Sequence, residues 1–553
     1  MDLACPGAHL YANLRALSQV APALVNRISW PVSGDHVGRA EEGSWHYHRG
    51  DRWFPLSLGD EARARALDPC AGSSPLAVLG LGDPLLVADL LAQDPERVVY
   101  AWDRDPWLLR LLLGAADFSD ALLHGKLRLL MGTDLLAART ALASCDTVMH
   151  PVLGQLYHHE RRLLAADPAL PLAFVARGGL FVDDVAEALW ESGYRVYTLD
   201  LQGLSQEELA LAVREARPRV LAAINYTEGL VEFCHELGLP LVCWEVDPST
   251  SALPPARLCT DSAHVFTYRK AHVPLFRGAG FSNVAYLPLA ANPVRRAPLP
   301  LDPEERLRYG GGRPTYVGSS IALEIPRFER SFLAVAQKVG GPEVGAEQAR
   351  AWLERALARQ RQDLNTLLAP TALDDIHPGL ASASGGAAAQ AVAEISAAEK
   401  RLRFVAGLGD LGMWVWGDAG WSAMDRLCPG HQAHYRGSAA HNLDVTKIYN
   451  ASAVNVDVGR IYQADIVTMR VFDIAACGGF VLAERSDALA EVFEVGTEIE
   501  THGSFDELHD KTRHYLAHPD RAAAFAARGR DAVLQRHTIS GRLVQMLARA
   551  NLA

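Results

Sequence analysis

The chain has 553 residues, about half of them apolar, which is enough for three or four domains and excludes a peptide, a fibre or a disordered tail. Its 53 basic and 65 acidic residues give a net charge of −12, which argues against nucleic acid as a partner, because affinity for phosphate backbones comes from clustered cations. The eight cysteines form no Cys-x-x-Cys pair, and no segment resembles a signal peptide or a transmembrane helix, so we expect reduced cysteines and a cytoplasmic protein.

Residues 1–65 are a less regular lead-in, in which we expect a helix near His9–Val20 and an aromatic, turn-rich stretch from Trp45 to Leu56. From about Leu76 onward, short apolar runs rich in β-formers alternate with amphipathic helical stretches. This alternation is typical of βαβ units and parallel sheets, so the predicted fold class is α/β.

The first predicted sheet belongs to a front domain over residues 66–170. A helix is expected after its first strand, running to about Gln93. The expected strands are Leu76–Gly82, Arg97–Trp102, Lys126–Leu130 and Thr147–Met149.

A second run of units covers residues 171–297, and its Pro-rich end, Ala297–Pro303, predicts a hinge or linker. The helices between its strands include Gln206–Ala216 and Gly229–Leu237. The expected strands are Leu172–Val175, Arg195–Leu199, Val220–Ile224, Pro240–Cys243, His264–Thr267 and Asn283–Leu287.

A third sheet is predicted within residues 298–553, interrupted by a helical insertion at about 341–402. Three helices end the chain: Phe505–Ala517, Pro519–Arg536 and Ser540–Asn551. The expected strands are Thr315–Gly318, Met413–Trp416, Ala453–Val456, Phe480–Ala483 and Glu498–Glu500.

The segment 448–484 carries the pattern that points most directly to chemistry. It predicts a strand, a loop, and a helix over Ile466–Ala476 that is stopped by two glycines. Asp465 and Asp473 are eight residues apart, a little over two helical turns, so we expect Asp465 to cap the helix and Asp473 to lie on the same side. The helix N-terminus and Arg470 could then bind a diphosphate, and Asp473 could accept two ribose hydroxyls.

This segment resembles the donor-binding signature of two-lobed (GT-B type) glycosyltransferases, where two glutamates eight positions apart precede Ala-Cys-Gly-x-Pro-Val-Val. Here Asp465 and Asp473 precede Ala-Cys-Gly-Gly-Phe-Val. The run Met-Arg-Val-Phe-Asp-Ile-Ala-Ala-Cys-Gly-Gly, residues 469–479, is more closely similar to the family of the spore-maturation protein CgeB and its bacterial glycosyltransferase relatives. The resemblance covers roughly residues 172–553, apart from the insertion. Both acidic positions carry Asp in place of Glu, which shortens their reach by one methylene.

The resemblance implies an α/β fold of two Rossmann-like (GT-B) lobes preceded by a third Rossmann-like domain. It implies a retaining, metal-independent transfer of a glycosyl group from a UDP- or GDP-sugar to a protein or glycan acceptor, with no obligatory cofactor. Asp473 would hold the ribose, Asp465 the donor sugar, and Arg470 the diphosphate. Further donor-binding positions would be Gly318, Lys447, Met469, Gly478 and Gly479.

If the enzyme instead inverts, it needs a general base from the lobe at 171–297, for which Asp247 is the first choice and His264 the second. Asp247 could equally be a turn residue before Pro248.

The front domain carries Gly80 and Gly82 after its first strand and an acidic residue, Asp103 or Asp105, after its second. This arrangement is that of a dinucleotide or S-adenosylmethionine site, which leaves a methyltransferase activity as an alternative function. The domain also loosely resembles the front domain of Maf-like protein-modifying glycosyltransferases, where it would dock an acceptor or form a homo-oligomer.

A third alternative is a catalytically inactive, nucleotide-binding or assembly protein, which the two shortened carboxylates suggest. No metal site is expected. The pairs His46/His48 and His158/His159 are interpreted as surface residues.

Overall fold

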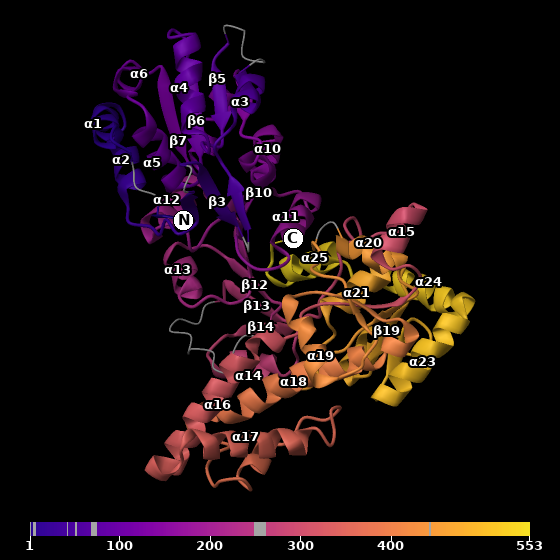
Figure 1. The fold of residues 1–553 in the computed structure, drawn as a ribbon. Coiled ribbons are helices and arrows are strands. Elements are labelled where there is room, and N and C mark those ends of the chain that lie inside the picture. Colours follow the sequence, from indigo (N-terminus) through magenta and orange to yellow (C-terminus); the bar gives the residue numbers. More distant parts are fainter. Residues whose placement is uncertain are drawn as a thin grey trace. The chain divides into compact units, whose positions relative to one another are not determined.

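The computed structural model describes residues 2–3, 7–40, 43–49, 52–67, 74–247, 261–441 and 444–552. The chain divides into two compact units, and the elements of both are labelled in Figure 1. Unit 1 consists of residues 1–266, 275–284 and 543–553, and unit 2 of residues 267–274 and 285–542.

The lead-in of unit 1 contains more structure than its sequence predicted. Helix α1 (Leu10–Val20) confirms the predicted helix, and a second helix, α2 (Pro22–Ser29), follows it. The aromatic stretch forms part of an antiparallel sheet in the order β1-β2-β3-β4, and α3 (Asp60–Leu67) follows it. Its strands are β1 (Asp2–Leu3), β2 (Val37–Arg39), β3 (Trp45–Arg49) and β4 (Arg52–Pro55).

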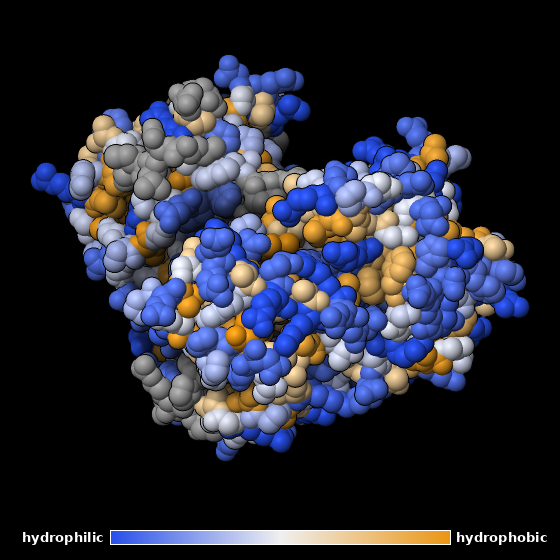
Figure 2. Space-filling view, turned by 60° about the horizontal axis from the view of Figure 1, so that its bottom comes forward, coloured by the Kyte–Doolittle hydropathy of each residue, from blue (hydrophilic) through white to orange (hydrophobic). Residues whose placement is uncertain are grey.

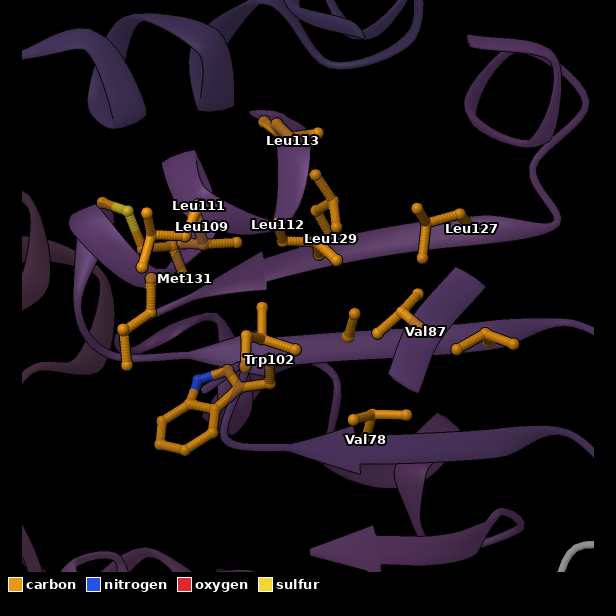
Figure 3. Packing of buried hydrophobic residues seen from close by; sticks show 14 of the residues in the cluster. Val78, Val87, Trp102, Leu109, Leu111, Leu112, Leu113, Leu127, Leu129 and Met131 are labelled. Atoms are coloured by element: carbon orange, nitrogen blue, oxygen red, sulfur yellow. The ribbon is translucent and has the colours of Figure 1, made fainter. Parts of the chain in front are cut away.

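The front domain has four parallel strands in the order β7-β6-β5-β8, which confirms the prediction. Figure 3 shows side chains of three of these strands, including Val78, Trp102 and Leu129, gathered in its core. The strands are β5 (Leu76–Leu79), β6 (Val99–Asp103), β7 (Leu127–Met131) and β8 (Asp146–Met149). The helices are α4 (Pro84–Gln93), α5 (Pro106–Ala115), α6 (Ser119–Leu123), α7 (Asp134–Ala137), α8 (Arg139–Leu142), α9 (Leu153–Leu156) and α10 (His158–Ala165).

A second sheet follows, with six strands in the order β10-β9-β11-β12-β13-β14. All six predicted strands and both named helices are present, because each apolar run is long enough for one buried strand. The strands are β9 (Leu172–Ala176), β10 (Arg195–Leu199), β11 (Val220–Ile224), β12 (Leu241–Glu245), β13 (Ala263–Thr267) and β14 (Asn283–Tyr286). The helices are α11 (Val182–Glu191), α12 (Gln206–Ala216), α13 (Leu230–Glu236) and α14 (His272–Gly278).

Unit 2 contains the third sheet, six parallel strands in the order β17-β16-β15-β18-β19-β20. The strands are β15 (Pro314–Val317), β16 (Trp414–Trp416), β17 (His434–Tyr435), β18 (Val454–Val456), β19 (Val481–Glu484) and β20 (Glu500–His502). The helices around it are α15 (Pro303–Tyr309), α19 (Met424–Leu427), α20 (Asp444–Ala451), α21 (Met469–Ala476), α22 (Asp487–Val492), α23 (Phe505–Ala517) and α24 (Pro519–Arg536), and α25 (Ile539–Arg549) runs on into unit 1.

The helical insertion of unit 2 begins earlier than predicted. Its first helix is α16 (Ile325–Gly340), which lies beside α17 (Ala346–Gln360) and α18 (Ala387–Gly407), as Figure 1 shows. These three helices share an apolar cluster of their own, which includes Phe332 and Trp352. The last turns of α18 instead pack into the core of the sheet through residues such as Leu402. With 21 residues, α18 is long enough to extend from the apolar cluster of the insertion to the sheet.

Among the described residues, no helix combines the length and the apolar character needed to cross a membrane. On the face drawn in Figure 2, hydrophilic and hydrophobic residues are interspersed. Five cysteines are free thiols, at positions 145, 234, 243, 428 and 477, which agrees with the prediction for them. Cys5, Cys70 and Cys259 lie outside the described residues.

Candidate functional site

The carboxyl edge of the unit 2 sheet brings together residues from β15, β18 and α21. Arg470, in the first turn of α21, donates from Nε to the carbonyl of Val317 at 2.7 Å and pairs with Asp457, which follows β18. Its guanidinium also lies 4.5 Å from the ring centroid of Tyr316. Arg470 therefore reaches the strand ends, where ligands of parallel sheets bind, and Asp457 balances its charge.

Gly318, directly after β15, makes this approach possible. A Cβ atom there would lie 2.6 Å from Nη2 of Arg470 and 3.2 Å from the hydroxyl of Tyr316. Gly318 therefore lets Arg470 lie across the strand end.

Arg401 lies at the same edge, and the sequence interpretation missed it. It is on α18, 6% exposed, and donates to the carbonyls of Ser319 at 2.8 Å and Val458 at 3.2 Å. Among the residues that the structure describes, its Nε has no hydrogen-bond partner and no carboxylate forms an ion pair with it. Burial lowers the pKa of this guanidinium, and the positive charges of Arg470 and Arg460 act in the same direction. The edge thus carries a buried positive charge that an anion would neutralise.

Helix α21 begins at Met469, three residues later than predicted. Thr468 occupies the N-cap position, but its hydroxyl donates to Oδ1 of Asp457 at 3.0 Å and does not cap the helix. The prediction that Asp465 caps this helix is therefore wrong, because the segment before Thr468 is not helical. The first amides of α21 are left without that side-chain cap and present the positive end of a helix dipole.

Asp465 instead forms a two-pronged ion pair with Arg269. Nε of Arg269 lies 3.0 Å from Oδ2, and Nη2 lies 2.7 Å from Oδ1. The side chain of Asp465 remains 34% exposed, so it is accessible within unit 2.

Asp473 is buried on α21 and pairs with Arg296, whose Nε lies 2.9 Å from Oδ2. Arg296 also donates to Thr446 and to Nε2 of His441, each at 3.0 Å. Burial opposes the charge of Arg296, but the carboxylate of Asp473 outweighs it and raises the pKa of the guanidinium. This ion pair fixes α21 to the chain segment that follows β14.

The other predicted donor-binding residues have structural contacts. Gly478 and Gly479 end α21, since their amides donate to the carbonyls of Ala475 and Ile474 at 2.9 and 3.0 Å. Met469 is the first residue of the same helix. Lys447, on α20, pairs with Glu305 at 2.6 Å.

In unit 1, Asp247 lies just beyond the end of β12, at the carboxyl edge of the second sheet. The side chain of Asn225, after β11, holds it: Nδ2 donates to Oδ2 at 3.1 Å, and Oδ1 accepts from the amide of Asp247 at 3.1 Å. Asn225 itself has a left-handed backbone with φ of 63°, which is uncommon outside glycine. Pro248, the predicted turn neighbour, lies outside the described residues.

His264 lies at the other edge of this sheet. It is the second residue of β13, and the amide of Leu241, which begins β12, donates to the carbonyl of Ser262 just before β13. The two strands therefore begin at the same edge, and the fold does not bring His264 to the edge where Asp247 lies.

The front domain uses its predicted ribose-binding carboxylate internally. Asp103 is buried and accepts from the amides of Leu81 and Asp105 at 2.8 and 2.9 Å and from the hydroxyl of Tyr157 at 2.7 Å. Burial, together with the charge of Asp105, raises the pKa of Asp103 to about 7. No ribose hydroxyl is needed to satisfy this group.

The glycine turn of the same domain is covered by the lead-in. A Cβ atom at Gly82 would lie 2.8 Å from Leu56 and 2.9 Å from His150, and His150 hydrogen-bonds the carbonyl of Leu56 at 2.7 Å. Since Leu56 occupies the space above the turn, the structure does not favour the methyltransferase alternative.

Residues 397–548, which include Arg401, Arg470 and Asp473, match the family model described as "Glycosyl transferase-like". This part of the chain is therefore similar to glycosyl transferase-like domains, whereas the closer likeness to the CgeB family stays a prediction. No curated protein matches the chain.

Three solved structures illustrate what the chain is similar to. A glycosyltransferase from Rickettsia africae ESF-5 shares 10% identity over 69% of this chain and 98% of its own, with a TM-score of 0.42. The Anabaena protein HepE, in complex with UDP and glucose, shares 13% identity over 69% of this chain and 100% of its own, with a TM-score of 0.39. Sucrose-phosphate synthase from Thermosynechococcus elongatus shares 13% identity over 68% of this chain and 97% of its own, with a TM-score of 0.38.

Proposed function

We propose that the protein transfers a glycosyl group from a nucleotide sugar to an acceptor and that unit 2 binds the donor. The glycosyl transferase-like match over residues 397–548 supports sugar transfer in general. The donor site rests on the buried guanidinium of Arg401 at the carboxyl edge of the unit 2 sheet, which forms no ion pair with a carboxylate among the residues that the structure describes. We expect a UDP- or GDP-sugar there.

The donor diphosphate is proposed to lie against Arg401, Arg470 and the uncapped amides of α21. When the glycosidic bond of the donor breaks, negative charge develops on the departing diphosphate. Two guanidinium groups and a helix N-terminus that are already in place stabilise that charge without reorganisation. The two arginines are thus proposed to neutralise the charge of the diphosphate, which a metal ion would otherwise neutralise.

Asp465 is proposed to contact the donor sugar. Each of its carboxylate oxygens can accept a further hydrogen bond while it remains paired with Arg269, so sugar hydroxyls can bind without breaking the ion pair. The ribose contact of Asp473 stays a prediction. Its burial and its bond to Arg296 favour a role in positioning α21.

The acceptor is proposed to be a protein or a glycan, and transfer to retain the anomeric configuration. In a retaining transfer the acceptor attacks on the face of the departing phosphate, and no protein base is needed. If transfer inverts, Asp247 is the proposed base, held by Asn225. The variant Asp247→Asn distinguishes the two mechanisms: an inverting enzyme should lose about a hundredfold or more in kcat, and a retaining one far less.

Calorimetric titration of the full-length protein with UDP, GDP, UDP-glucose and GDP-mannose tests the donor site. Arg401→Gln should weaken nucleoside diphosphate binding about tenfold or more, because one charge-assisted contact to phosphate is lost. Arg355→Gln, at an exposed arginine of α17, is the matched control and should bind as the wild type does.

Release of nucleoside diphosphate from the sugar donors then tests turnover. If the wild type binds none of the four compounds, or if Arg401→Gln binds as tightly as wild type, the proposal is wrong. Binding without hydrolysis or transfer would support the inactive nucleotide-binding alternative.

A further inference from the structure

Two histidines and an aspartate from different helices meet within unit 1. His158 and His159 are the first residues of α10, and Asp183 is in the first turn of α11. The ring centroids of the histidines lie 3.9 Å apart, and Nε2 of His159 lies 3.4 Å from Oδ1 of Asp183. One possible ligand atom from each of the three residues lies within 4.8 Å of those of the other two.

Burial of this cluster differs from the sequence interpretation. The prediction that both histidines lie at the surface is wrong for His159, whose side chain is 4% exposed. His158 is the more accessible of the two. The buried imidazole of His159 therefore faces a carboxylate and a second imidazole, and the three side chains hold several potential metal-ligand atoms close together.

We propose that His158, His159 and Asp183 bind a divalent transition-metal ion of the Zn²⁺ class. Two imidazole nitrogens and one carboxylate oxygen are donors that suit zinc, cobalt and nickel. Around a tetrahedral zinc ion with bonds of about 2.0–2.1 Å, the ligand atoms lie roughly 3.3 Å from one another. Small side-chain rotations would shorten the present distances between these atoms to that value and complete the site. A water molecule would occupy the fourth position.

The orientation of His158 supports this assignment. Its Nδ1 lies 3.2 Å from the carbonyl of Gln155. With the proton on Nδ1, this contact is a hydrogen bond that leaves Nε2 unprotonated and available to a metal. Such a bond from the second ring nitrogen to a carbonyl is how proteins commonly orient a metal-binding histidine.

The position of the site indicates what the ion does. Helix α10 follows the last strand of the front domain, and α11 follows β9 of the second sheet. An ion held by both helices would therefore link the front-domain sheet to the second sheet within unit 1. The site is separate from the proposed donor site, which lies in unit 2, so neither proposal depends on the other.

Titration of the tag-free, full-length protein tests the site, after chelator treatment and dialysis. Zn²⁺ binding is followed by calorimetry, and Co²⁺ binding by visible absorption, which reports ligand number and geometry. We expect a single tightest site, weakened about tenfold or more in His158→Gln and in Asp183→Asn, because each variant removes one of three ligands. His235→Gln, at an exposed histidine of α13, is the matched control and should bind as wild type does.

Thermal unfolding provides a second measurement. Zn²⁺ should raise the Tm of the wild type and of His235→Gln, and should raise it less in His158→Gln. The proposal is overturned if the wild type binds no Co²⁺ or Zn²⁺ at a defined site, or if either His158→Gln or Asp183→Asn retains wild-type affinity. His158 is the more accessible ligand, so we expect His158→Gln to fold even if variants at the buried His159 fail to fold.

Discussion

Two histidines of unit 2 accept hydrogen bonds from arginines. Nε2 of His441 faces Nη2 of Arg296 at 3.0 Å, and Nδ1 of His537 faces Nη2 of Arg542 at 2.8 Å. A guanidinium can only donate, so the facing ring nitrogen must be unprotonated. Burial lowers the pKa of both imidazoles to about 4, and the neighbouring arginines act in the same direction.

His537 gives a pH-dependence that can be measured. Its folded pKa is below the unfolded value of about 6.5, so the neutral ring stabilises the fold above that pH. This stabilisation is lost as the pH falls from about 6.5 towards 4, because the unfolded chain takes up the proton first. Between pH 7.5 and 5.0 it amounts to about 1–2 kcal/mol.

His537→Gln should remove this dependence, because a glutamine amide can still accept from Arg542 but does not titrate. Urea unfolding at the two pH values measures it: the wild type should lose about 1–2 kcal/mol more than the variant. Equal losses in both proteins would contradict the assignment of a neutral His537.

At the scale of elements, two successive glycines end α21. Gly478 has φ of 70°, the left-handed conformation that ends many helices. A Cβ atom at Gly479 would lie 2.9 Å from both the carbonyl of Tyr449 and Nδ2 of Asn455. The two glycines thus end the helix and let the next strand approach α20.

Alanine substitutions separate these two effects. Gly478→Ala should lower the free energy of unfolding by about 1–2 kcal/mol through backbone strain. Gly479→Ala should lower it by about 1–3 kcal/mol through overpacking. Gly345→Ala is the control, since φ there is −71° and nothing lies within 4 Å of the added Cβ, so denaturant unfolding should show little change. A neutral Gly479→Ala would show that the neighbouring backbone yields easily.

At the scale of the whole molecule, one buried arginine joins three parts of unit 1. Arg27, on α2 of the lead-in, donates to both oxygens of Glu208 on α12 at 2.8 and 2.9 Å. It also donates to both oxygens of Asp134 on α7 at 2.8 and 3.0 Å. The lead-in, the front domain and the second sheet therefore share one guanidinium, which agrees with their place in a single compact unit.

Arg27→Met should destabilise unit 1 by about 3–5 kcal/mol, because it leaves Glu208 buried without its counter-charge. Arg65→Met, which removes an exposed pair with Glu61 in the same unit, should cost less than about 0.5 kcal/mol. Scanning calorimetry of both variants measures the difference. Similar melting curves for the two would mean that Arg27 does not join these parts energetically.

Much of the fold could be predicted from local pattern. Buried strands such as Val220–Ile224 and helices such as Gln206–Ala216 were predicted with their observed bounds, because each is encoded by a continuous run with one periodicity. The antiparallel strands of the lead-in were missed, since they are short and only half buried. Helix α16 was missed because no element was predicted between the strand at Thr315–Gly318 and the insertion at about 341–402.

The candidate site was predicted only in part. The motif at 465–479 led to Arg470 and to the glycine end of α21, both of which lie within one stretch of sequence. The roles of Arg401, Arg296 and Arg269 could not be predicted from the sequence. Each of these arginines hydrogen-bonds a residue about 60 to 200 positions away.

The sequence by itself determined the α/β class, the strands of three parallel sheets and the position of the glycosyl transferase-like motif, because apolar periodicity and turn residues are local properties. Only the tertiary structure decided which charges are paired. In the folded protein, Asp465 pairs with Arg269, Asp473 pairs with Arg296, and Asp103 accepts hydrogen bonds from backbone amides. Arg401 has no carboxylate partner among the described residues. Those pairings depend on how distant segments pack, and the free energy of burying a charge is set by that packing.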